Sequence, residues 1–268
     1  EISIMTSTLV KEKILEENRR VHALENKLYL PRHPEQTNFF QERIVEKILN
    51  LACSQLNPNA KILDLGCGTG YLFLRFLKRG FKLTGVDLSS EMIQVLENSI
   101  AEKEKERARL VVGDVESYIE ENIKEFDLIV FSAVMHHLFD YQMVLKRACR
   151  GLNSGTKILI FFEPLKQKTY PSIRYGLHRC LSWIDEKLYQ IEMAIRNIPI
   201  FEDEYHHSDY QRQFGGVDLH NIEKILKEEE CSIHQVEKYC ARRFGINAWL
   251  ANRILKTQNT FNILAEKN

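Results

Sequence analysis

The chain has 268 residues, of which 44% are hydrophobic and 28% are charged, a composition typical of folded globular proteins and unlike that of disordered, collagen-like or disulfide-framework chains. Lys and Arg together number 37, as do Asp and Glu, so the formal net charge is zero. No global positive field therefore favours nucleic acids or anionic membranes, and any such surface must be local.

Six scattered cysteines form no C-x-x-C pair and no Cys/His spacing typical of zinc, which indicates reduced thiols. The first residues lack the apolar core and the cleavage site of a signal peptide. No apolar run approaches the roughly 18 residues of a membrane span. We therefore expect a cytoplasmic protein.

Hydrophobic periodicity predicts a charged helix with one apolar face from about Leu9 to Tyr29, ended by Pro31 and Pro34. A second helix is expected from about Gln41 to Leu51. Five short apolar runs follow and alternate with helices; the predicted strands are 61–65, 83–87, 110–113, 126–131 and 157–162. This alternation predicts an α/β fold, with a doubly wound, mostly parallel sheet covered by helices on both faces.

After Pro164 the pattern becomes a long helix whose apolar residues recur at spacings of three and four from Ile173 to Ile198. The stripe must be covered, either by the sheet domain or a second copy of the chain, or by an apolar substrate or a bilayer surface. A polar, aromatic loop at 201–216 and a helix at 218–227 come next. Strands are expected at 231–240 and 260–264, with a helical segment between them.

A glycine-rich loop joins the first strand to its helix. In the run Gly66, Cys67, Gly68, Thr69, Gly70, the glycines let a ligand approach the main chain. Asp87 ends the next strand, where a carboxylate can accept hydrogen bonds from the hydroxyls of a ribose. A dinucleotide fingerprint would need a third glycine where this chain has Tyr71, which disfavours a nicotinamide oxidoreductase.

The segments LDLGCGTG, GVD, GDV and FDLIVFSAVMHHL occur in this order and resemble the class I S-adenosylmethionine-dependent methyltransferases, most of all their small-molecule branch. The resemblance covers about residues 36–164. It implies a Rossmann-like sheet of seven strands that ends in an antiparallel hairpin strand, and S-adenosyl-L-methionine as cofactor, with S-adenosyl-L-homocysteine as product. The residues that it assigns to the cofactor are Asp64, Gly66, Cys67, Gly68, Gly70, Asp87, Leu88, Asp114, Val115 and Ser132.

For the chemical step, strand four ends in a histidine pair at the edge of the sheet where α/β folds place ligands. His137, or else His136, is the candidate base or acceptor-orienting group, because a histidine can take a hydroxyl proton near neutral pH. The alternatives are helix capping and solvent exposure. The candidate acceptor-binding residues are Tyr29, Glu163, Tyr205, His206, His207 and Arg212.

No metal is expected, because adjacent histidines cannot readily both bind one ion, and strand four lacks the acidic end that metal-dependent catechol methyltransferases use. No nucleic acid is expected either. Amino methyltransferases that act on nucleic acids have a motif of Asn or Asp, two prolines and an aromatic residue after strand four, whereas this chain has Ser132 to Met135 there. The zero net charge also argues against a nucleic-acid acceptor.

The sequence thus predicts a transferase that moves a methyl group to an oxygen, or less readily a nitrogen or carbon, of a small molecule, including lipid-linked or sugar-bearing ones. A SAM-binding partner subunit without activity is the alternative. We expect an N-terminal helical lid at 1–35, a cofactor-binding core at 36–164, a helical cap at 165–230 and completing strands at 231–268. The helix at 171–198 would mediate a homodimer or a peripheral membrane contact. The sequence does not identify the acceptor molecule.

Overall fold

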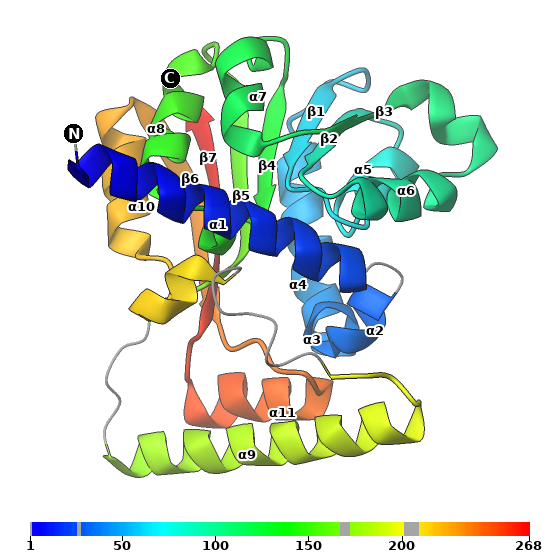
Figure 1. Ribbon diagram of the computed structural model, residues 1–268, viewed down its shortest axis with the longest axis vertical. Helices are drawn as coiled ribbons and strands as arrows, with labels where there is room; N and C mark the ends of the chain where they lie inside the picture. The colour runs from blue at the N-terminus through cyan, green and yellow to red at the C-terminus, as the bar shows by residue number, and fades with distance from the viewer. Residues whose placement is uncertain (1, 26–27, 167–171, 201–208) are drawn as a thin grey trace.

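One seven-stranded sheet forms the centre of the computed structural model, which describes residues 2–25, 28–166, 172–200 and 209–268 (Figure 1). The strand order is β3-β2-β1-β4-β5-β7-β6. The strands are β1 (Lys61–Leu65), β2 (Lys82–Asp87), β3 (Ala108–Val112), β4 (Leu128–Ser132), β5 (Lys157–Pro164), β6 (Cys231–Tyr239) and β7 (Thr260–Lys267).

The sheet is mixed. Strands β1 to β5 pair in parallel, whereas β7 runs antiparallel to both of its neighbours, β5 and β6. The α/β fold and the seven strands are confirmed, and the expectation of a mostly parallel sheet is corrected to a mixed one. The reason is connectivity, because the last strand returns by a hairpin and inserts between β5 and β6 instead of crossing over.

Helices cover both faces of the sheet. Side chains at successive positions of a strand point to opposite faces, so the apolar runs build two cores. One core packs α4, α5 and α6 on the sheet, and the other packs α7, α8 and α10. These helices are α4 (Phe39–Cys53), α5 (Phe73–Lys78), α6 (Ser90–Ser99), α7 (Val115–Asn122), α8 (Tyr141–Gly151) and α10 (Leu219–Glu228).

Several helix ends follow local sequence signals. The side chains of Ser89, Asp114 and Asp140 accept hydrogen bonds from backbone amides in the first turns of α6, α7 and α8. Gly80 follows α5 with a φ of +99°, the left-handed conformation expected there. Local side chains and one glycine therefore define these helix boundaries.

The N-terminal region differs from its predicted form. Helix α1 (Ile2–Glu25) ends earlier than expected, and two single-turn helices follow it, α2 (Tyr29–Arg32) and α3 (Pro34–Thr37). Pro34 can open α3 because the first helical position needs no amide hydrogen. The buried stripe of α1 comprises Ile14, Asn18, Val21 and Glu25, so two polar side chains lie on its inner face.

Helices α9 (Ser172–Ile195) and α11 (Gly245–Leu250) lie side by side at one end of the molecule (Figure 1). The expectation that the sheet domain covers the apolar stripe of α9 is wrong. Most of its members are exposed, among them Ile173, Ile184 and Leu188. None of the helices in the described part of the chain combines the length and the apolarity that crossing a membrane requires.

Candidate active site

A cleft of about 1140 Å³, counting its open mouth, lies at the carboxyl ends of β1, β2 and β4 and beneath α1. α1 crosses the front of the sheet in Figure 1 and closes one side of this cleft. The lining includes eleven of the predicted site residues, namely Tyr29, Asp64, Gly66, Cys67, Gly68, Asp87, Leu88, Asp114, Val115, Ser132 and His137.

Two glycines of the loop after β1 act differently. Gly68 has a φ of +50°, and a Cβ atom built on it would meet nothing within 4 Å, so the main chain here is open to a ligand. Gly70 does not line the cleft. Its φ is +93°, and a Cβ atom there would lie 2.4 Å from Leu96 Cδ1, so this glycine allows close packing of the loop on α6.

Asp87 links the loop to the second strand. Its Oδ2 accepts a hydrogen bond from the Gly68 amide at 2.8 Å, and its Oδ1 accepts one from the Ser89 amide at 2.9 Å. Burial raises the pKa of Asp87, although the His22 imidazole and the two amides act in the opposite direction. The carboxylate therefore shapes the loop as well as lining the cleft.

Asp64 is almost fully buried at the end of β1, and its side chain faces the cleft. Its Oδ1 has no hydrogen-bond partner among the described residues. Burial, together with the charge of Asp87, raises the pKa of Asp64 to about 7. A buried carboxylate oxygen without a partner is costly, so this position fits a cationic group of a ligand.

Cys67 also lines the cleft, but its packing is structural. The thiol lies where a Cβ atom on Gly85 would come within 2.8 Å of Sγ. Burial raises the pKa of Cys67 well above its usual range. A thiol that stays protonated is a poor nucleophile, in keeping with the sequence argument that Cys67 belongs to the loop pattern.

Glu163 holds the turn that carries the two histidines. It is fully buried, and its Oε1 accepts hydrogen bonds from the amides of Val134 and Met135 at 2.8 and 2.9 Å. Its Oε2 lies 2.9 Å from His136 Nδ1. Glu163 and His136 therefore lie behind the cleft wall. The sequence predicts Glu163 as an acceptor-binding residue, but here it does not line the cleft.

His137 does line the cleft, and it meets Asp209. His137 Nδ1 and His136 Nε2 each lie 3.6 Å from Asp209 Oδ1, and the two imidazole rings are 4.0 Å apart. Burial by itself raises the pKa of Asp209, but the charges of His136, Arg212 and His137 outweigh it and hold the pKa below its usual value. Asp209 is thus a charged partner for the histidine pair.

The same three side chains could hold a metal ion, because their ligand atoms lie within 4.8 Å of one another. Arg212 Nε, however, lies 3.0 Å from Asp209 Oδ2 and already balances the carboxylate charge. This arrangement fits an acid–base cluster better than a cation site.

The acceptor residues predicted from the sequence have mixed placements. Tyr29 lines the cleft, and its hydroxyl accepts a hydrogen bond from Gln36 Nε2 at 3.1 Å. Arg212 lies outside the lining with its side chain mostly exposed. Tyr205, His206 and His207 lie outside the described residues.

A lid at 1–35 is expected from the sequence, but none of the α1 residues that line the cleft is among the predicted site residues. Lys11, Asn18 and His22 line the cleft, and the His22 ring is 5.4 Å from that of His137 in an edge-on arrangement. Lys11 Nζ forms an ion pair of 2.5 Å with Glu116 on α7 across the cleft mouth. The available signal was the spacing of Asn18 with the buried apolar positions of the helix, because a polar residue on a buried stripe needs a partner or a ligand.

Two non-glycine residues beside the cleft have left-handed backbone conformations. Ala133 has a φ of 52° and Phe162 a φ of 60°, and both line the cleft. Such conformations cost of order 1–3 kcal/mol and concentrate at functional sites. The Phe162 amide donates to Asn262 Oδ1 at 2.9 Å, which helps to hold this bulge of β5.

Comparisons with known proteins agree with this geometry. Residues 56–172 match a family model described as a methyltransferase domain. The chain is 30% identical over 151 residues to a malonyl-[acyl-carrier protein] O-methyltransferase of Priestia megaterium (strain DSM 319 / IMG 1521), covering 55% of this chain and 51% of that protein. It is 25% identical over 138 residues to a ubiquinone biosynthesis O-methyltransferase of Idiomarina loihiensis, covering 51% of this chain and 56% of that protein.

The chain thus spans about half the length of these curated relatives. Among solved structures it is similar to magnesium protoporphyrin IX methyltransferase from Synechocystis PCC 6803 with bound SAM, with a TM-score of 0.56 and 12% identity. That likeness covers 94% of this chain and 97% of the other, and it shows a shared fold.

Proposed function

We propose that this chain, whose residues 56–172 match the methyltransferase-domain family model, is a class I S-adenosylmethionine-dependent methyltransferase that transfers a methyl group from S-adenosyl-L-methionine to a small-molecule acceptor. One observation carries the proposal above the others. Asp64 presents a buried carboxylate oxygen without a partner among the described residues to a cleft that the open main chain of Gly68 also lines. This pair of features fits an amino acid group attached to an adenosyl group.

The lining residues fit the parts of that cofactor. Asp64 would pair with the methionyl ammonium, and Asp87 would accept hydrogen bonds from the ribose hydroxyls. Asp114 and Val115 would meet the adenine edge at the start of α7, while Leu88 would lie against the ring. When bound, the cofactor supplies a methyl group on a positively charged sulfur, which makes the carbon electrophilic.

The chain itself aligns the acceptor and excludes water. Ile14 and Leu15 of α1 line the cleft opposite the loop, and Phe139 and Phe162 add apolar surface near the histidines. The ion pair between Lys11 and Glu116 fixes α1 across the mouth. We therefore propose that residues 1–35 act as a lid over the core of residues 36–164.

His137 is the proposed base. As the acceptor oxygen bonded to the methyl carbon, the carbon–sulfur bond would break and S-adenosyl-L-homocysteine would leave. The His137 imidazole would take the hydroxyl proton, and the Asp209 carboxylate near Nδ1 would stabilise the resulting charge. Glu163 and His136 act as positioning residues, because they fix the turn before His137 from behind. Asp209, which is not among the residues predicted from the sequence, is added to the proposed site residues. Its position beside the two histidines supports a cap formed by residues 165–230 near the site.

Oxygen is the favoured acceptor atom, since both named relatives are O-methyltransferases. The acceptor class is a small molecule, including lipid-linked or sugar-bearing ones. In this proposal residues 231–268 complete the sheet, and the lid and the cap determine the acceptor specificity.

Calorimetry with S-adenosyl-L-homocysteine tests the proposal directly. We expect saturable binding at one site, and in a co-crystal the ligand should occupy the cleft with its amino group on Asp64. Reduced nicotinamide dinucleotide is the control and should not bind. If the demethylated cofactor gives no heat at millimolar concentration and leaves the cleft empty, the methyltransferase assignment for this chain fails.

A further inference from the structure

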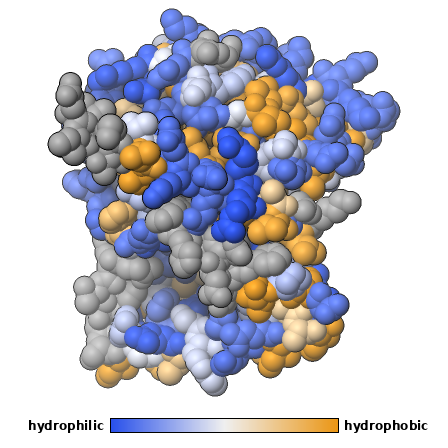
Figure 2. Space-filling model, in the orientation of Figure 1, coloured by the Kyte–Doolittle hydropathy of each residue, from blue (hydrophilic) through white to orange (hydrophobic). Residues whose placement is uncertain are grey.

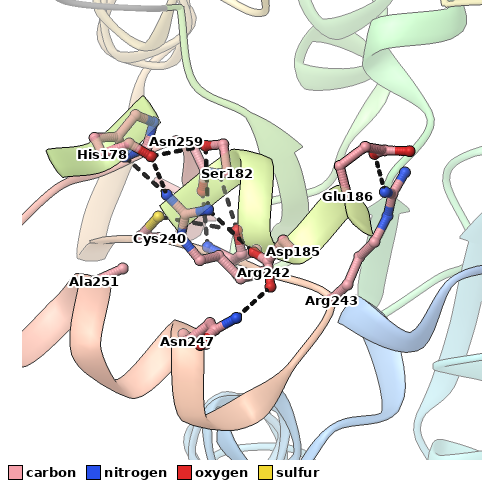
Figure 3. A network of polar contacts seen from close by, with 12 residues as sticks. His178, Ser182, Asp185, Glu186, Cys240, Arg242, Arg243, Asn247, Ala251 and Asn259 are labelled. Carbon is pink, nitrogen blue, oxygen red and sulfur yellow. Dashed lines mark hydrogen bonds and ion pairs between the residues drawn. The ribbon is translucent and has the colours of Figure 1, made fainter. Parts of the chain in front are cut away.

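A buried polar network helps to hold helix α9 to the rest of the molecule. Arg242, which follows β6, donates to Asp185 Oδ2 at 3.0 Å, to Ser182 Oγ at 3.2 Å and to the His178 carbonyl oxygen at 3.2 Å (Figure 3). Asn247 of α11 donates to Asp185 Oδ1 at 2.8 Å. Arg242, Asp185 and Asn247 are all buried, so this network fixes the orientation of α9.

Further contacts fix the same inner face. Arg243 forms an ion pair with Glu186, and its guanidinium lies 3.8 Å from the centre of the Tyr189 ring. Tyr189 and Met193 are buried. The inner face of α9 is therefore the one that carries Asp185, Tyr189 and Met193 at spacings of four residues.

The outer face of α9 is apolar. At about 100° per residue, a second set of side chains is centred about 130° around the helix from the buried set. These side chains are more than two-fifths exposed; they are Ile173, Leu177, Ile184, Leu188, Ile191 and Ile195. In Figure 2 hydrophobic surface is visible at both corners of the lower end, with hydrophilic surface between them. A surface helix usually turns its apolar side chains to the core and its polar ones to solvent, whereas α9 buries the charged side chain of Asp185 and exposes an apolar stripe.

Both tryptophans of the chain are exposed at this end of the molecule. Trp183 on α9 is 64% exposed and Trp249 on α11 is 44% exposed. Ile246 and Ile254, in α11 and the turn that follows it, are exposed as well. Exposed tryptophan beside aliphatic side chains is typical of surfaces that rest at the interface of a bilayer.

The described helical segments at this end carry a positive charge, although the chain as a whole is neutral. Residues 172–196 and 240–256 contain eight Lys and Arg against three Asp and Glu, a surplus of five positive charges. The three acidic residues, Asp185, Glu186 and Glu192, each form an ion pair with an arginine. Among the described residues, Arg179 and Lys187 have no carboxylate partner, and Lys187 lies next to the apolar stripe on the helix.

We infer that the outer face of α9, together with α11, docks on the surface of an anionic lipid bilayer. The aliphatic stripe and the tryptophans would enter the headgroup region, and the surplus cations would face lipid phosphates. A second copy of the chain fits this face less well, because a symmetric dimer would bring two positive surfaces together.

Co-sedimentation with vesicles tests this inference. The protein should bind vesicles of phosphatidylcholine that contain phosphatidylglycerol and bind vesicles of phosphatidylcholine alone much more weakly. Its intrinsic fluorescence should shift to shorter wavelength on binding, and this signal reports on the proposed face because Trp183 and Trp249 are the chain's two tryptophans. Absence of binding to the anionic vesicles would overturn the inference.

Variants locate the contact. Leu188→Glu and Lys187→Glu should each lower the partition coefficient, the first by about tenfold or more because a charge replaces an inserted side chain. The matched controls are Ile233→Glu on the edge strand β6 and Lys103→Glu on the solvated segment before β3, and both should bind as the parent does. Equal losses in variants and controls would overturn the inference, as would a stable dimer in buffer that Leu188→Glu abolishes.

The inference stands apart from the proposed function, because none of the described residues of α9 or α11 lines the cleft. Calorimetry with S-adenosyl-L-homocysteine should therefore give the same affinity in Leu188→Glu as in the parent chain. Vesicle binding without cofactor binding would support the docking surface and refute the methyltransferase assignment. Cofactor binding without vesicle binding would support the methyltransferase assignment and refute the docking surface.

Discussion

Glu163 and His136 form a buried pair in which Glu163 Oε2 lies 2.9 Å from His136 Nδ1, while the other carboxylate oxygen accepts from two backbone amides. The pair joins the end of β5 to the turn after β4. Because that turn continues directly into His137, the position of the proposed base depends on a carboxylate that does not itself line the cleft.

Glu163→Gln should therefore disturb catalysis without emptying the cofactor site. An amide nitrogen would then face backbone donors, so we expect a loss of about 1–3 kcal/mol of unfolding free energy. The turnover number should fall about tenfold or more, while the affinity for S-adenosyl-L-homocysteine should change less than about threefold. Urea unfolding and calorimetry give the two quantities. Glu266→Gln, which removes an ion pair with Lys157 on β5, is the control and should leave turnover unchanged.

His137→Gln tests the base itself. If His137 takes the acceptor proton, turnover should fall by about 10² to 10⁴ with the cofactor affinity nearly unchanged. His234→Gln on β6 is the matched control, because His234 is exposed and pairs with Glu266 away from the cleft. A parallel decline of turnover and cofactor affinity in His137→Gln would assign His137 to binding instead.

Asp87→Ala should weaken cofactor binding by about 1–3 kcal/mol, because the ribose hydroxyls lose a charged acceptor and the Gly68 amide loses its partner. Asp87→Asn retains one oxygen for the amide, so it should lose less. Titration calorimetry with S-adenosyl-L-homocysteine measures both. Unchanged affinity in Asp87→Ala would refute the ribose assignment.

The pH dependence of cofactor binding follows from Asp64. Its pKa is about 7 in the ligand-free cleft, and only the ionised carboxylate attracts an ammonium group. Affinity should therefore rise about tenfold between pH 6 and pH 8 as the proton leaves. In Asp64→Asn the affinity should be lower, and this rise should disappear. A flat pH profile in the parent chain would show that Asp64 does not meet the ammonium.

The cofactor loop could be predicted because its signals are local. Gly68 and Asp87 are placed by a strand, a turn and a second strand that the sequence marks clearly, and parallel strands bring their carboxyl ends to one edge. Residues 61–65 form a strand as predicted for the same reason.

The remaining parts of the site depend on contacts between distant segments. Asp209 reaches the histidines from beyond α9, and His22 reaches them from α1, and no spacing in the sequence encodes either approach. Helix α9 shows a further limit of prediction from the sequence. Its periodicity reveals an apolar face but not the direction in which that face points, which the buried Arg242–Asp185 pair decides.

His33 should make the stability of the protein depend on pH. Burial lowers its pKa, but the carboxylates of Glu25 and Glu35, at 3.3 and 2.9 Å, outweigh burial and raise the pKa from 6.5 to about 9. A group whose folded-state pKa is raised contributes stability that is full below about pH 6.5 and is lost as the pH rises through 9. Because 27% of the His33 side chain is exposed, water screens part of the effect, and we expect about 1–2 kcal/mol.

Urea unfolding at pH 6.5 and pH 9.5 measures this contribution. The free energy of unfolding of the parent chain should exceed that of His33→Gln at the lower pH, and the difference should shrink at the higher pH. His220→Gln, on the exposed side of α10, is the control and should follow the parent at both values. A difference between parent and His33→Gln that stays constant across this range would mean that the Glu25–His33–Glu35 cluster stabilises the fold by packing and not by charge.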